Sequence, residues 1–152
     1  MRFVISGAKA LVIICLLSGC AGSTQPLPDE PIVPSITVNG EAVALLDGGY
    51  CWAVDEEKSV CSSPLPPDTL EPMIEAQSSA AASGAAVRIR FLVPPDRSGV
   101  LVRSGGLWVP AAMHDAERFM LPKRGGYYRF LVWGEWGERN TASYHFGVFV
   151  AP

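Results

Sequence analysis

Two cysteines are the first candidates for chemistry in this chain of 152 residues. Cys51 and Cys61 lie in the stretch YCWAVDEEKSVC, with nine residues between them. Such a pair can bind a metal ion, act as a redox couple or form a structural disulfide bridge. A redox couple usually has the spacing CxxC, and a structural zinc site needs two further ligands. The compartment helps to decide among the three, because disulfides persist under oxidising conditions.

A polar cluster is the best candidate for enzymatic chemistry. His114, Asp115 and Glu117 offer an imidazole and two carboxylates, which are ligand types for a divalent metal. A catalytic zinc site needs three protein ligands with an open position, and a polar loop between strands explains the same cluster. The other histidine, His145, is expected on the surface of a sheet. Because the chain also has no nucleophile, phosphate-loop or zinc-protease motif, we predict no catalytic residue, no metal and no cofactor.

The first twenty residues carry the signals that set the compartment. A positively charged start precedes the apolar run Ala10 to Leu17, which is shorter than the roughly 20 residues that cross a bilayer. The sequence LSGC then ends at Cys20 and resembles the lipobox of bacterial lipoproteins. In that family a peptidase cuts before the cysteine, which carries a diacylglyceryl group. The resemblance implies that residues 1–19 are a signal peptide and that Cys20 is lipidated; a plain signal peptide or an anchor helix is the alternative.

The residues after Cys20 bear on the location of the protein. In the lipoprotein family, an aspartate directly after the cysteine directs the protein to the inner membrane of a double-membraned cell, and here that residue is Ala21. We therefore expect the outer face of a single-membraned cell or an outer membrane. Residues 20–34 contain four prolines and are expected to form an extended tether, which rises about 3.1 Å per residue.

Composition is typical of one turn-rich domain at residues 35–152. Fifteen glycines and 13 prolines favour short strands joined by turns over long helices. The chain has a formal net charge of −3, and removal of the leader, which contains Arg2 and Lys9, would make the remaining chain more acidic by two charges. An acidic domain of this kind argues against a nucleic-acid partner.

Apolar alternation predicts about seven to eight short strands. Asn39-Gly40 between apolar runs predicts a tight hairpin turn. Two long strands, at 127–136 and 142–150, are expected to close the chain as a hairpin with a shared inner stripe, formed by Tyr128, Phe130, Val132, Tyr144, Phe146, Val148 and Val150. The pattern predicts an all-β fold, a two-layer β-sandwich.

Three segments interrupt the strand pattern. Asp68, with Glu71 three residues later, predicts one short helix that begins with a capping box. The small residues at 78–86 are expected to form a linker, and Asp47-Gly48-Gly49 is expected to break a strand.

The closing hairpin carries a second resemblance. The run LPKRGGYYRFLVWGEW followed by ASYHFGVFV is similar to the last hairpin of bacterial immunoglobulin-like domains. With GGYCW and the second cysteine, it also resembles a group of uncharacterised lipoproteins from Bacillus-type bacteria. The resemblance implies an immunoglobulin-like sandwich outside the cytoplasm. It implies no activity.

Aromatic side chains opposite the inner stripe are candidates for ligand binding. Trp133 and Phe149 fall on that outer face, and Trp108 lies near a glycine pair. Exposed rings can stack on sugars or contact a partner protein. Alternatively, the segment from Leu70 to Ile74 covers them as a second small core.

These observations lead to one main prediction and two alternatives. Outside the cytoplasm, where the lipobox resemblance places the chain, Cys51 and Cys61 are expected to form a disulfide. The chain is expected to be a non-catalytic binding or envelope-interaction module, attached to the membrane through lipid on Cys20. Its partner would be an envelope protein or a glycan. A carbohydrate or cell-wall glycan binding module is the alternative, and a small metal-dependent hydrolase is the minor alternative.

Overall fold

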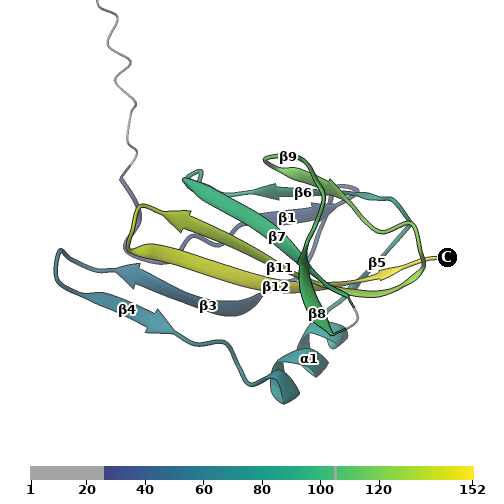
Figure 1. The fold of residues 1–152 in the computed structure, drawn as a ribbon, viewed down its shortest axis with the longest axis horizontal. Coiled ribbons are helices and arrows are strands. Elements are labelled where there is room, and N and C mark those ends of the chain that lie inside the picture. Colours follow the sequence, from purple (N-terminus) through teal and green to yellow (C-terminus); the bar gives the residue numbers. More distant parts are fainter. Residues whose placement is uncertain (1–25, 105) are drawn as a thin grey trace, which may run out of the picture.

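Alternating apolar residues produce two sheets that pack face to face in the computed structural model, which describes residues 26–104 and 106–152 (Figure 1). The smaller sheet has the order β2-β1-β6-β10-β9. Its strands are β1 (Ser35–Val38), β2 (Glu41–Ala42), β6 (Ala86–Arg90), β9 (Met113–Asp115) and β10 (Arg118–Met120). The larger sheet has the order β4-β3-β12-β11-β7-β8, and β5 pairs in parallel with β12. Its strands are β3 (Leu46–Ala53), β4 (Ser59–Ser62), β5 (Ser79–Ala81), β7 (Arg97–Ser104), β8 (Leu107–Pro110), β11 (Gly126–Trp136) and β12 (Asn140–Val150).

The prediction of an all-β sandwich with one short helix is confirmed for the described residues. The sheets contain more strands than the seven to eight expected, because several strands are pieces of only two to four residues. Asn39 and Gly40 have positive φ angles of 49° and 89°, as the predicted turn between β1 and β2 requires.

The predicted inner stripe forms the core between the sheets. Phe130 and Val132 of β11 are buried together with Phe146 and Val148 of β12. They pack against the smaller sheet through Val87 and neighbouring apolar side chains. Burial of each of these side chains contributes about 1.5–3 kcal/mol, so the closing hairpin is the main stabilising element of the fold.

A second apolar cluster lies at the end of the sandwich where β11 and β12 join. Trp52 and Trp136 meet there edge to face, with ring centres 5.4 Å apart. The Trp52 indole N–H donates to the Pro28 carbonyl oxygen (2.9 Å), and Ile32 is buried in the same cluster. The proline-rich segment before β1 therefore contacts the domain over part of its length.

Helix α1 (Pro67–Ala76) is the short helix that the sequence predicts, but its start differs from the prediction. Pro67 occupies the first helical position and no described side chain caps the helix, so the capping box at Asp68 is wrong. The Pro66 carbonyl instead accepts hydrogen bonds from the backbone N–H groups of Thr69 and Leu70. Proline fits this position because its fixed φ suits a helix and its missing N–H would have no intrahelical partner.

Two further expectations are wrong. Residues 79–81 form strand β5, which pairs with the end of β12, where a linker was expected. Gly48 and Gly49 lie inside β3, where a break was expected. A Cβ on Gly48 would lie 2.8 Å from the Ser143 hydroxyl oxygen, so the glycine allows β3 to pass close to β12.

The disulfide between Cys51 and Cys61 is present, and this prediction is confirmed. The two cysteines are directly opposite in the pairing of β3 with β4, with 4.1 Å between their Cα atoms. The bridge therefore fastens β4, an outermost strand of the larger sheet. Among the described residues, no helix is long and apolar enough to span a bilayer.

Candidate functional site

The outer face of the larger sheet carries a cleft that is lined by residues of helix α1 and of strands β7, β8, β11 and β12. Figure 1 shows α1 beside β8. This outer-face cleft has two lobes, and Arg129 lines both. The apolar lobe has a volume of about 490 Å³ and is lined mainly by Pro64, Leu65, Pro66, Leu70, Trp108, Leu131 and His145. The polar lobe has a volume of about 330 Å³ and is lined by Glu71, Glu75, Arg103 and Tyr127.

Arg129 is the central side chain of the cleft and is only 7% exposed. It stands on β11 opposite the core stripe, in the middle of the apolar run YYRFLVW. Its Nη1 donates to Glu71 Oε1 (2.7 Å), and its guanidinium lies 4.9 Å from the centre of the Trp108 ring. Its Nε is buried and has no hydrogen-bond partner among the described residues. The chain therefore uses only part of the bonding capacity of this cation.

His145 lies beside Arg129 under the same tryptophan. Its side chain is buried, the Trp108 ring centre is 5.7 Å from its own, and its Nδ1 has no partner among the described residues. Burial and the charge of Arg129 lower the pKa of His145 to about 4, against smaller opposing effects from the Phe130 backbone and Asp47. The imidazole is therefore neutral at pH 7. His145 lies on the outer face of the sheet, opposite the core stripe, as expected, but it is not an ordinary surface residue, because its side chain is buried and Trp108 of β8 packs against it.

His145 is expected to remain neutral as the pH falls from 7 to 5 and to take up a proton only near pH 4. In the unfolded chain a histidine titrates at about 6.5, so the unfolded state binds more protons between these values. Stability should therefore fall as the pH is lowered through this window, and be fully recovered above about pH 6.5.

Imidazole ¹H–¹⁵N spectra recorded against pH measure this directly. The sequence has two histidines, and exposed His114 gives the internal reference signal. The matched variant His145→Gln should lose both the late titration and the corresponding pH dependence of the urea midpoint. A midpoint for His145 at about pH 6 or above would contradict the prediction.

The three aromatic residues singled out from the sequence lie in separate contacts on the outer face. Trp108 covers Arg129 and His145, whereas Phe149 pairs with Tyr127 at 4.9 Å between ring centres. The ring of Trp133 lies against Gly99 of β7, where a Cβ would be 2.9 Å from it. Leu70 and Ile74 of α1 are buried, and Phe149 stays 41% exposed. No ring-to-ring contact joins the three among the described residues, so they do not form one platform.

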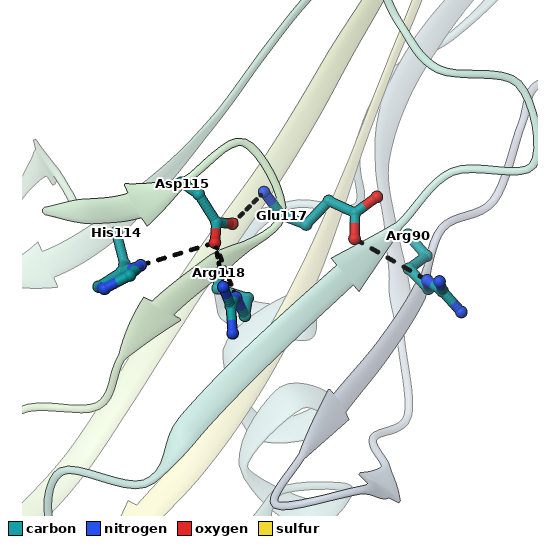
Figure 2. A network of polar contacts seen from close by, with 5 residues as sticks. All are labelled: Arg90, His114, Asp115, Glu117 and Arg118. Atoms are coloured by element: carbon teal, nitrogen blue, oxygen red, sulfur yellow. Dashed lines mark hydrogen bonds and ion pairs between the residues drawn. The ribbon is translucent and has the colours of Figure 1, made fainter.

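The His114 cluster is held by contacts within its own turn, as Figure 2 shows. Asp115 accepts hydrogen bonds from the Glu117 backbone N–H (2.9 Å) and from Arg118 Nε (2.7 Å). These contacts lower the pKa of Asp115 to about 2, the backbone bond being the largest cause. Glu117 turns the other way, toward Arg90. Across residues 26–104 and 106–152, no three His, Cys, Asp or Glu side chains are grouped so that they could bind a metal.

Comparison of the chain with protein family models, with curated proteins and with solved structures found no match. Fold and site together define a class: a β-sandwich with a helix-bordered cleft on one outer face. Sequence reasoning missed Arg129. The available signal was a lone arginine in the longest apolar strand, on the face away from the core, where a solvated arginine is the ordinary interpretation.

Replacement of Arg129 by methionine is expected to change the free energy of unfolding by no more than about 1 kcal/mol. The change loses the stacking of the guanidinium on Trp108, but it also removes a buried Nε without a partner. Glu71 is left half exposed and can be solvated by water. Urea unfolding measures the difference, and Arg97→Met, at an exposed ion pair with Glu135, is the control. A loss above about 3 kcal/mol would show that Arg129 has a structural role.

Proposed function

We propose that this chain is an extracytoplasmic lipoprotein, anchored through Cys20, whose domain is a non-catalytic binding module. The observation that carries the binding role is the buried guanidinium of Arg129, which the chain satisfies only in part and which lines both lobes of a cleft. Polar groups of this kind usually find a partner, and a ligand supplies one. The lipobox and Cys20 lie outside the described residues, so the anchor is supported by the sequence resemblance alone.

The proposed partner is an envelope component. In-cell crosslinking followed by mass spectrometry tests this, with the wild type beside Arg129→Met and the control Arg97→Met. We expect an enriched envelope partner with the wild type and the control, and a weaker signal with Arg129→Met. Absence of any enriched envelope component with the wild type would count against a binding role.

The lipid anchor makes a separate prediction. Cys20→Ala is expected to abolish labelling with a radioactive or clickable fatty acid and to release the domain from washed membranes, because one thiol carries the whole anchor. Cys15→Ala, which changes a cysteine inside the expected leader, is the matched control and should keep both properties. Membrane retention of Cys20→Ala with lipid label would refute the anchor.

A glycan-binding role is the second candidate, and the geometry of Trp133 favours it. This ring lies over the Gly99 backbone and is only half buried, so part of it is open on the outer face. Aromatic rings in such positions stack on the apolar faces of sugars. A pull-down on insoluble peptidoglycan should then retain the wild type and lose Trp133→Ala. Equal retention of the two proteins would exclude Trp133 as the contact.

A further inference from the structure

Charge in the outer-face cleft is unevenly distributed. Arg129 and Arg103 share one carboxylate oxygen, Glu71 Oε1, at 2.7 and 3.4 Å. The Glu71 side chain is 50% exposed, whereas the Arg129 side chain is 8% exposed. The most buried cation of the cleft therefore depends on a half-solvated anion that it shares. A second anion would complete its pairing.

The geometry of the guanidinium specifies the kind of anion. Glu71 takes the Nη1 end, which leaves the edge formed by Nε and Nη2. A carboxylate matches such an edge with two parallel hydrogen bonds. The Nδ1 of neutral His145, under the same tryptophan, also has no partner among the described residues. Two buried nitrogens without partners thus lie in neighbouring side chains of one cleft.

The walls of the apolar lobe specify what the anion is attached to. Prolines, leucines and the Trp108 ring form most of the lining, and none of the described residues that line this lobe is acidic. Within the described lining, Arg129 is the one permanent charge, because His145 is neutral at pH 7. The volume of about 490 Å³ falls within the usual size of small-molecule sites. Such a lobe favours a flat apolar group and disfavours a cation.

Trp108 lies directly beside the buried guanidinium. Its ring centre lies 4.9 Å from the guanidinium of Arg129, whose Nε is buried. The ring belongs to β8, a four-residue edge strand that pairs with β7 alone among the described strands. A side chain on such a strand can shift without disturbing the core. Because Nε is buried, a carboxylate can reach it only if a covering side chain moves, and we take this side chain to be Trp108 on its edge strand.

We propose that the outer-face cleft binds a carboxylate carried on a flat apolar group, with Arg129 pairing the carboxylate and Trp108 stacking on the apolar group. The inference rests on the proposed binding role and names its chemistry. Two sources share this chemistry: a small free acid, or the terminal carboxylate of a peptide whose last residue is aromatic.

Titrations with matched probes test the proposal by ¹H–¹⁵N spectra of the full mature domain. Benzoate represents a free acid and N-acetylphenylalanine a chain end; benzamide and N-acetylphenylalanine amide are their neutral counterparts. At least one acid is expected to shift the His145 ring and Trp108 indole signals to saturation. Its amide should bind about tenfold or more weakly, because the charged pair is lost. The acid that binds more tightly identifies the source.

Variants assign the contact. Arg129→Lys should weaken the acid about tenfold, since an ammonium cannot make the bidentate pair, and Arg129→Met should abolish binding. Arg97→Lys is the control and should bind as the wild type does. Equal affinity for acid and amide, or no saturable shift with either acid, would overturn the proposal. The crosslinking and lipidation tests do not use these probes, so the proposed function and this inference can fail separately.

Discussion

Trp136→Ala is expected to lower the free energy of unfolding by about 3–5 kcal/mol. The ring is 3% exposed and contacts both Trp52 and Phe91 edge to face, at 5.4 and 5.3 Å between centres. Its indole N–H donates to the Val93 carbonyl oxygen in a buried hydrogen bond (2.9 Å). Truncation therefore opens a cavity and leaves that carbonyl without its donor. A domain of this size has about 5–15 kcal/mol of stability in all, so the loss is a large fraction.

Trp133→Ala is the matched control on the same strand. Trp133 lies three residues earlier, faces outward and is half buried. Its removal should cost about 1–2 kcal/mol, because water already reaches part of the ring. Urea unfolding followed by circular dichroism compares the two variants. Equal losses would mean that the cluster around Trp136 is not the core that the packing indicates.

Removal of the disulfide by the double change Cys51→Ser with Cys61→Ser is expected to lower stability by about 3 kcal/mol, the chain-entropy value for a loop of this length. The bridge joins residues separated by ten positions and fastens β4, which otherwise pairs with β3 alone among the described strands. Arg139 also holds this turn, donating to the carbonyl oxygens of Asp55 and Glu56. We therefore expect a folded domain with reduced stability.

The reduced wild type provides the control for this change. A reductant should lower the urea midpoint of the wild type to that of the double variant, and should leave the variant unaffected. Thiol titration of the denatured mature protein, without reductant, should give no free Cys51 or Cys61. Two free thiols per mature chain would refute the bridge.

Local patterns account for what the sequence predicted well. The core stripe of β11 and β12 follows from two-residue alternation, and the turn at Asn39-Gly40 follows from the φ angles of two adjacent residues. The disulfide was predicted from the expected location outside the cytoplasm and from spacing that suits neither a redox couple nor a zinc site. Each of these needs only neighbouring residues, or a signal at the start of the chain.

The cleft could not be predicted in the same way. Arg129 and His145 face away from the core and lie against Trp108 of β8, and Arg129 also pairs with Glu71 of α1; both elements are distant in the sequence. Strand β5 was missed for a related reason. Its small residues have low strand propensity, and its place is set by pairing with β12, about 70 residues away.

The contact of Pro28 with Trp52 also restricts how the domain can face a membrane. Eight residue steps separate Cys20 from Pro28, and fully extended they span at most roughly 28 Å. This tether attaches at the end of the sandwich that holds Trp136. Arg129 lies seven residues back along β11, roughly 23 Å from Trp136. With Cys20 lipidated as proposed, the attached end of the domain stays within roughly 28 Å of the bilayer. The domain would then contact only partners that lie within a limited distance of the membrane surface.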